Sequence, residues 1–385
     1  MLNLEQQIFR QIERSSSILI ALPTGSEHQA NKGDAVASSL ALYLFLKKIG
    51  KRVEIVSQPT GDKNQSTFFL PGHKDIQNSL INLRRFIVSI NIGQAKIHNI
   101  KYTVDQGKLN FIISPAEGWF QSEDVSTRAG EFKYDLIFTV GVSDLESLGK
   151  IYDDNIEFFY KTTIINIDNQ ATNEEFGQIN FIDLNAVALS EIIYYLLKNY
   201  QPQDIDENTA TCLLAGIIQK TKNFKTANLT PRTLLTTSEL IDRGARREEI
   251  IEHLYKARNF SSLKLWGKIL NNLQTGKNGA ILWSTIKQSD YPLSFAGQGG
   301  LDDLIDELIT SVPGTKLIAI LIEGEDKTTT VRLYSLKNIN ALAALKNYNP
   351  SGNSRVVSAT IKSEPKDAAS SVILELERYL DKLSA

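Results

Sequence analysis

Three consecutive polar residues, Asp168, Asn169 and Gln170, are the best placed in this chain to take part in chemistry. They follow residues 163–167, a β-branched run that predicts a buried strand. In an open α/β sheet, ligands bind at the carboxyl ends of the parallel strands. The Asp168 carboxylate can help to place a cation, and the two amides can bind a base or a sugar. Neither amide can replace an imidazole as an acid or a base.

The elements that must position these residues follow one another in the order of a parallel sheet. Apolar runs predict buried strands, and a helical run that stops at Gly50 lies between the first two of them. This strand–helix–strand order favours parallel pairing, so the expected fold class is α/β. The predicted strands are 17–22, 51–57, 134–140, 163–167 and 179–183, and the predicted helices include 34–49, 186–197 and 207–219.

Two further segments accompany this parallel-sheet domain, which we place at residues 1–244. Alternating residues at 79–131, with a turn at 105–107, predict an antiparallel insertion at a sheet edge. A charged helical stretch at 245–274 predicts a connector, and residues 275–385 predict a smaller α+β domain. The chain is therefore expected to fold as two domains joined by helices.

Composition limits the functions open to this chain. The formal net charge is −2, so nucleic-acid binding would need a local basic groove rather than a global field. The single cysteine, Cys212, excludes an internal disulfide framework and lies in an apolar run, which predicts a core thiol. Residues 1–16 predict an amphipathic helix, and no apolar run is long enough to span a bilayer. We expect a cytoplasmic protein without a membrane partner.

Residues 166–180 read NIDNQATNEEFGQIN. This run resembles the N-I-D-H-H-x-x-N-x-x-F-G-x-x-N motif of the DHH phosphoesterases, which include the RecJ-like and nanoRNase (oligoribonuclease) proteins. The frame of the motif is complete, but Asn169 and Gln170 stand where the family has two histidines. The resemblance implies a DHH domain and a DHHA1-like domain. It also implies cleavage of phosphoesters by two manganese ions, which clamp the attacking water and the leaving oxygen.

The other metal-binding motifs of the family are altered in the same way. His28 and Asp34 are kept in the first motif, but Lys32 replaces its first aspartate. Gly141 stands where the resemblance expects the aspartate that bridges both metals, and Lys220 stands where it expects a further aspartate. Only His28 and Asp34 therefore remain of the family's metal ligands. We expect no metal or other cofactor here, although active relatives use manganese.

The two lysines lead to a hypothesis about what replaced the metals. Lys32 and Lys220 would neutralise Asp34 and Asp168 as metals do in an active relative, and would repel a dication. Two charges about 4 Å apart interact by roughly 4 kcal/mol at an effective dielectric constant near 20. A structural alternative remains for each carboxylate. Asp34 can cap its own helix, and Asp168 can cap the turn that follows it.

The predicted second domain resembles the DHHA1 domain, whose glycine-rich loop helps to hold the phosphate and the base of the substrate. Only Gly352 remains of the loop glycines, Asn353 replaces its histidine, and Pro350 removes one backbone amide. Lys337 stands where the family has an arginine. The resemblance therefore implies Lys337, Gly352 and Asn353 as positions of a degraded substrate-binding loop.

Two classes of function are compatible with these residues. The first is a binding protein that has lost two-metal catalysis and holds a nucleotide, a short single-stranded RNA or a partner protein, such as an active relative or a second copy. The second is an active manganese-dependent phosphoesterase or oligoribonuclease with an altered site. An exposed apolar face on residues 79–131 would favour a protein partner. A basic groove facing Lys220 and Lys337 would favour nucleic acid.

Overall fold

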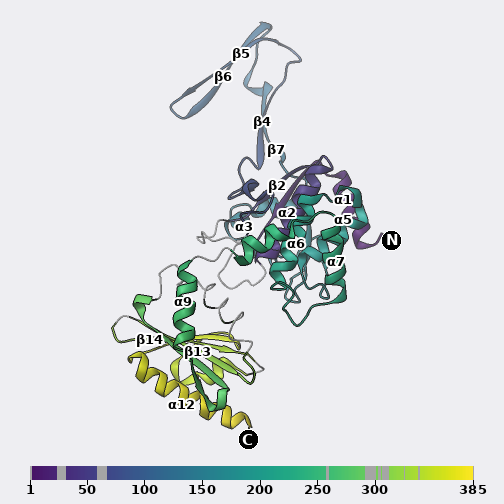
Figure 1. Cartoon of the computed structure of the whole chain (residues 1–385). Helices are drawn as coiled ribbons and strands as arrows, with labels where there is room; N and C mark the ends of the chain where they lie inside the picture. The colour runs from purple at the N-terminus through teal and green to yellow at the C-terminus, as the bar shows by residue number, and fades with distance from the viewer. Residues whose placement is uncertain are drawn as a thin grey trace. The chain divides into compact units, whose positions relative to one another are not determined.

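The computed structural model describes residues 2–23, 32–58, 67–256, 260–290, 301, 305, 312–324, 326–336 and 339–384. The chain divides into two compact units, Met1–Lys256 and Ala257–Ala385, and each is considered by itself (Figure 1). The division falls inside the connector predicted at 245–274. Among the described helices, none has the length and apolar character needed to cross a membrane.

The first unit is built on a six-stranded sheet whose neighbouring strands are all parallel, in the order β10-β9-β8-β1-β2-β3. The α/β fold class is therefore confirmed. In β1, Ile18 and Ile20 belong to one buried cluster and Leu19 and Ala21 to another, so both faces of the sheet are covered. The strands are β1 Ser17–Ala21, β2 Arg52–Val56, β3 Ile76–Gln77, β8 Leu136–Val140, β9 Thr163–Asp168 and β10 Ile179–Ile182.

Helices cover both faces of this sheet. Apolar residues of α2, α5 and α6 join the buried cluster that contains Ile18, whereas α3 and α4 contribute to the cluster that contains Leu19. Cys212 is buried in the first of these clusters, as predicted. The helices are α1 Leu4–Arg14, α2 Lys32–Lys48, α3 Lys150–Asp153, α4 Ile156–Lys161, α5 Leu189–Tyr200, α6 Glu207–Lys220, α7 Pro231–Asp242 and α8 Arg247–Ile251. The predicted start of α5 at residue 186 is wrong, because the helix begins at Leu189.

The insertion consists of two antiparallel ladders, which confirms the antiparallel character predicted for residues 79–131. β4 Arg84–Ile90 pairs with β7 Val125–Phe132, and β5 Lys96–Asp105 pairs with β6 Lys108–Glu117 (Figure 1). Gln106 and Gly107 connect β5 to β6 with φ angles of +46° and +76°. Two successive positive φ angles match a tight hairpin turn, whose twist suits the flanking strands.

The second unit is a mixed sheet in the order β11-β12-β13-β14-β16-β15, with β12 and β13 as its parallel pair. Residues of α12 and of α9 join two separate buried clusters with the sheet strands. The predicted α+β character is confirmed. The elements are α9 Phe260–Asn271, β11 Gln274–Gly276, β12 Ile281–Ile286, β13 Leu317–Glu323, β14 Thr329–Ser335, α11 Ala341–Ala344, β15 Ser351–Gly352, β16 Val356–Ile361 and α12 Pro365–Ser384.

Candidate functional site at the carboxyl edge of the parallel sheet

Four of the predicted site residues meet at the carboxyl edge of the parallel sheet. They are Asp34, Gly141, Asp168 and Lys220, and we call them the carboxyl-edge site. Asp168 is the last residue of β9, and Gly141 directly follows β8. Lys220 ends α6, and its charge interacts with the carboxylates of Asp34 and Asp168. Burial lowers the pKa of Lys220, and the attraction of the two carboxylates opposes this shift.

The Asp34 carboxylate caps α5 rather than its own helix. Its Oδ2 accepts the N–H of Leu189 at 2.6 Å, and its Oδ1 accepts the N–H and the hydroxyl of Ser190 at 3.2 and 2.7 Å. This contact satisfies amides that α5 cannot satisfy itself, because Ala188 is its N-cap residue and offers no side-chain acceptor. The expectation that Asp34 caps its own helix is wrong, since α2 begins at Lys32 and Asp34 lies inside it.

Burial dominates the electrostatics of Asp34. Its side chain is almost completely buried, and desolvation raises its pKa, although the hydrogen bonds from Ser190 and Leu189 and the charge of Lys220 oppose the shift. The amino end of α5 carries the positive end of the helix dipole, which also favours the ionised carboxylate. Asp34 is therefore held by the protein's own donors and by a neighbouring cation.

Gly141 occupies a place that leaves no room for a side chain. Its φ angle is +68°, and a β-carbon added there would lie 2.7 Å from Cδ1 of Leu189 and 3.1 Å from Cβ of Ala35. Any L-residue at this position would combine a left-handed backbone with these contacts. Where the resemblance expects a carboxylate that bridges two metals, this chain has an apolar contact made by Leu189.

Asp168 is fully buried and is bonded within its own turn. Its Oδ1 accepts the N–H of Asn169 at 2.7 Å, and its Oδ2 accepts the side-chain amide of Asn173 at 2.7 Å. Burial raises its pKa, while hydrogen bonds from Asn173, Asn169 and Gln170 oppose that shift. Asn173 also donates to the carbonyl of Val142 at 2.9 Å, so it ties this turn to the loop after β8. The kept frame residues therefore have a structural role here.

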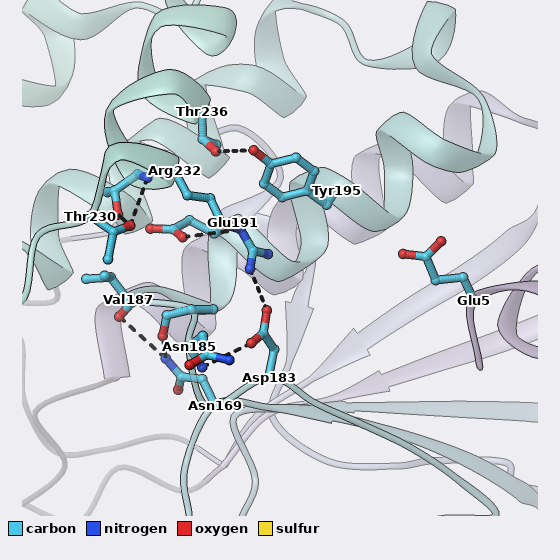
Figure 2. Close-up of polar contacts among 12 residues, drawn as sticks. Glu5, Asn169, Asp183, Asn185, Val187, Glu191, Tyr195, Thr230, Arg232 and Thr236 are labelled. Atoms are coloured by element: carbon cyan, nitrogen blue, oxygen red, sulfur yellow. Dashed lines mark hydrogen bonds and ion pairs between the residues drawn. The ribbon is translucent and has the colours of Figure 1, made fainter. Parts of the chain in front are cut away.

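Asn169 also has a positioning role in place of the family's histidine. Its side-chain amide donates to the carbonyl of Ala186 at 3.0 Å. It also donates to the carbonyl of Val187 at 3.4 Å (Figure 2). These carbonyls lie just before α5, so Asn169 fixes the segment whose helix then binds Asp34. Gln170 is half-buried and donates to Asp168 through its backbone and its side chain.

Arg232, which the sequence did not single out, joins α7 to the end of β10 and to α5. Its Nη1 lies 2.7 Å from Oδ2 of Asp183, and its Nε lies 3.9 Å from Oε2 of Glu191 (Figure 2). Its guanidinium also lies over the ring of Tyr195, 4.6 Å from the centroid. Arg232 and Asp183 are 49 positions apart, so no local spacing predicts their contact.

The described donor set does not fit a two-manganese centre. Manganese prefers carboxylate and water oxygens with open lone pairs, whereas the oxygens of Asp34 and Asp168 accept bonds from N–H and O–H groups. The described residues include no cluster of three potential metal ligands. His28 lies outside them, and Lys32 is described only as the first residue of α2. The positive charge of Lys220 would also repel a divalent cation at this site.

The predicted substrate-loop residues lie in the second unit. Gly352 has a φ angle of +134°, and a β-carbon there would lie 2.3 Å from the carbonyl oxygen of Val356. The Asn353 side chain accepts the N–H groups of Arg355 and Val356, both at 2.9 Å. Both residues thus build the turn before β16, and Lys337 lies outside the described residues. A substrate role for these three positions stays a prediction.

Comparison with known proteins adds a family assignment to this geometry. The model of the DHH family, N-terminal domain, matches residues 26–217. The chain is 26% identical over 351 residues to the bifunctional oligoribonuclease and PAP phosphatase of Thermus thermophilus, covering 91% of this chain and 87% of that protein. It is 27% identical over 217 residues to the protein of the same name from Bacillus subtilis, covering 56% of this chain and 67% of that protein.

A solved structure has a similar fold. An exopolyphosphatase-related protein from Bacteroides fragilis superposes with a TM-score of 0.67, covering 99% of this chain and 98% of that one. The two sequences are 18% identical, so this likeness concerns the fold alone.

Proposed function

We propose that this chain, which belongs to the DHH family through residues 26–217, has lost two-metal catalysis and binds a nucleotide or a short single-stranded RNA at its carboxyl-edge site. The relatives in Thermus thermophilus and Bacillus subtilis are named for activity on oligoribonucleotides and on PAP, which suggests the class of ligand. The replaced metal-ligand positions support the loss of two-metal hydrolysis in a chain that retains the fold of the family.

The observation that carries this proposal is the environment of the Asp34 carboxylate. Three donors from Leu189 and Ser190 bind it, and the charge of Lys220 adds to them. A two-metal hydrolase needs such oxygens to coordinate the ions that activate the water and stabilise the leaving group. Here the amino end of α5 and Lys220 supply the positive charge instead. This supports the hypothesis that protein cations replaced the metals, with Lys220 as the described lysine.

Groups suited to ligand binding remain next to these carboxylates. Gln170 is half-buried, and its amide can pair with the edge of a base. Lys222 and Lys225 follow α6 directly and are exposed, so they form a basic rim that can attract phosphate groups. The ligand would therefore place its base near Gln170 and its phosphates on the rim.

Two measurements on the full-length protein test this proposal. Titration calorimetry with Mn²⁺ should detect no binding at the carboxyl-edge site, and a short RNA and PAP should not be hydrolysed in the presence of Mn²⁺. The same ligands should bind, and Lys220→Glu should weaken that binding by roughly tenfold or more, as expected for loss of one phosphate-attracting cation and gain of a repelling anion.

Arg247→Glu is the matched control for the change of charge. Arg247 is exposed and follows Arg246, which pairs with Glu207 in the first turn of α6. Lys220 is at the other end of this helix, roughly 20 Å away. Arg247→Glu should leave ligand binding unchanged. Mn²⁺-dependent hydrolysis that disappears in Asp34→Asn would contradict the proposal and establish an active phosphoesterase with an altered site.

A second candidate function is self-association through the β5–β6 hairpin, and one observation favours it. Cross-strand partners lie on the same face of a ladder, as do residues two apart. Three consecutive pairs on one face are apolar: Ile100–Ile113, Tyr102–Phe111 and Val104–Leu109. Tyr102 is 71% exposed and Val104 is 72% exposed. This is the exposed apolar face on the insertion that favours a protein partner.

A second copy of the chain is the occupant that fits this face best. An isolated two-stranded hairpin is only marginally stable in water, and packing it against another apolar face would give it a core. A face that is apolar throughout is self-complementary, as a two-fold dimer requires. Sedimentation should show a dimer that Tyr102→Lys shifts to monomer. Thr103→Lys, on the polar face, should leave it intact, and a monomeric wild type at all concentrations would rule this candidate out.

A further inference from the structure

A basic groove lies at the opposite edge of the parallel sheet from the carboxyl-edge site. It is a hollow of about 1410 Å³ between the amino ends of β1, β2, β8 and β9 and the β4–β7 ladder of the insertion. Eight of its lining residues are Lys or Arg, and three are Asp or Glu. We call this hollow the basic groove. β1 has five residues, so roughly 17 Å of strand separates the two edges of the sheet.

Two of the three acidic residues are already engaged by neighbouring groups. Glu54 forms an ion pair with Lys133 at 2.5 Å and accepts the hydroxyl of Tyr134 at 2.7 Å. Asp135 accepts the backbone N–H groups of Ser16 and Ser17, at 2.8 and 3.2 Å. Lys133 therefore neutralises Glu54, whereas Asp135 keeps its charge because backbone N–H groups are neutral donors. The lining as a whole still holds five more cationic than anionic side chains.

Three exposed arginines contribute to this excess of positive charge. Arg52, Arg85 and Arg128 are exposed, and they form no ion pair with any residue that the structure describes. By contrast, Arg84 and Lys161 share the Glu157 carboxylate. Arg52 comes from the amino end of β2, and the other two come from β4 and β7, so the insertion and the sheet each contribute to the same positive surface.

An exposed aromatic ring distinguishes this surface from a simple anion site. A second hollow of about 740 Å³ shares Arg85 with the basic groove and is also lined by Phe86, which is 73% exposed. Cations that track a backbone together with a ring on which bases can stack are the features of sites for single-stranded nucleic acid. In a duplex the bases are stacked on one another, so no base face would be free to stack on the Phe86 ring.

We propose that the basic groove binds the phosphate backbone of a single-stranded RNA, with Arg52, Arg85 and Arg128 on the phosphates and Phe86 against a base. This site is separate from the carboxyl-edge site and does not depend on the function proposed there. Three phosphate contacts to a single strand give a slope of log K against log[salt] of about −2. Affinity should therefore fall roughly 20-fold between about 50 and 200 mM salt.

Fluorescence anisotropy of the full-length protein with a labelled oligouridine RNA of about a dozen nucleotides tests this proposal. Arg52→Glu and Arg128→Glu should each weaken binding about tenfold, and each should reduce the salt slope by about 0.7. Phe86→Ala should weaken binding about tenfold and leave the salt slope unchanged, because stacking releases no counterions. The unfolding midpoints should match that of the wild type, because these side chains are exposed.

Control variants and competing ligands decide the outcome. Arg247→Glu makes the same change of charge outside the groove and should bind RNA like the wild type. Equal affinity for an RNA duplex of the same length would overturn the proposal, as would binding to anionic phospholipid vesicles without binding to RNA. RNA binding that is lost in Lys220→Glu but kept in both arginine variants would place the strand at the carboxyl-edge site alone. RNA binding that is lost only in the arginine variants would support RNA binding in the basic groove. This result would hold even if no ligand binds at the carboxyl-edge site.

Discussion

Gly216 lies so close to Asp34 that a β-carbon at position 216 would stand 2.5 Å from the Asp34 Oδ1 atom. The same β-carbon would lie 2.0 Å from Oγ of Ser190. The absence of a side chain on α6 therefore makes room for the contact between the Asp34 carboxylate of α2 and the amino end of α5. One glycine thus determines how three helices meet beside the candidate site.

Gly216→Ala should lower the free energy of unfolding by about 1–3 kcal/mol, because the added methyl group must displace Ser190 or Asp34 in a closely packed core. Urea unfolding of the full-length protein measures this loss. Gly267→Ala is the matched control, since Gly267 is in α9 and a β-carbon there meets no atom within 4 Å. It should stabilise its helix by about 0.5–1 kcal/mol. A neutral Gly216→Ala would show that the contact is looser than the structure implies.

Lys220→Gln should destabilise the protein at neutral pH and have a much smaller effect in acid. Asp34 has its pKa raised above 3.8 by burial, and Lys220 opposes this rise. Between 3.8 and the raised pKa the folded state binds more protons than the unfolded state, so stability falls as the pH rises. Removing Lys220 raises the folded pKa further, which extends this loss to higher pH.

Urea midpoints of wild type and variant, compared at pH values from about 4 to 8, measure this difference, because burial raises the folded pKa of Asp34 above 3.8. Lys225→Gln is the control, because Lys225 is exposed in the turn after α6. A gap between wild type and Lys220→Gln that stays constant with pH would show that Lys220 acts by packing rather than by charge.

The elements of the fold could be predicted because each has a local signal. The β-branched runs predict β8 and β9, and the hairpin turn is encoded at Gln106 and Gly107. The start of α7 also has a local signal, because Thr230 directly precedes Pro231 and its side chain accepts the N–H of Thr233. The start of α5 has none, because the acceptor that caps it comes from Asp34, 155 positions earlier in the chain. A helix end that is capped by another element leaves no signature in its own sequence.

The candidate site could be predicted as a set of positions but not as a set of interactions. The motifs predicted that Asp34, Asp168 and Lys220 belong to one site, and in the structure Lys220 lies near enough to both carboxylates to feel their charge. No spacing indicated that Leu189 fills the space beside Gly141, because this contact depends on the packing of α5 against the loop after β8. The basic groove was also missed, since the amino ends of strands and an insertion contribute to it jointly.

Gly141 and Leu189 should be energetically coupled. Gly141→Ala should lower the free energy of unfolding by about 1–3 kcal/mol, because it combines a positive φ angle with a β-carbon 2.7 Å from Cδ1 of Leu189. Leu189→Ala alone should cost about 2–5 kcal/mol, since the side chain is fully buried. The double variant should be more stable than the sum of the single losses predicts, by about 0.5–2 kcal/mol, because the shortened side chain makes room for the new methyl group.

A double-mutant cycle on unfolding free energies measures this coupling. Leu240→Ala provides the comparison, because Leu240 is equally buried but belongs to α7 and is not among the atoms near Gly141. Gly141→Ala and Leu240→Ala should be additive within about 0.5 kcal/mol. Equal coupling in both cycles would mean that the effect spreads through the core and does not reflect the Leu189 contact.

Arg232→Met should destabilise the first unit in a pH-dependent way, because it leaves the Glu191 carboxylate in the core without its cation. Burial raises the pKa of Glu191 above its ordinary value of 4.5, and the charge of Arg232 opposes the rise. Without Arg232 the folded pKa rises further, so the loss of stability should grow as the pH increases above 4.5. Since Arg232 is partly exposed, we expect the free energy of unfolding to fall by about 1–3 kcal/mol at neutral pH.

Glu191→Gln in the Arg232→Met background separates the two ion pairs of the arginine. It should restore part of the stability at neutral pH and remove the pH dependence, because the neutral amide needs no counterion. Arg10→Met, at an exposed position of α1, should have little effect at any pH. If Glu191→Gln restores nothing, the lost stability belongs to the pair with Asp183, and Glu191 is protonated in the native protein.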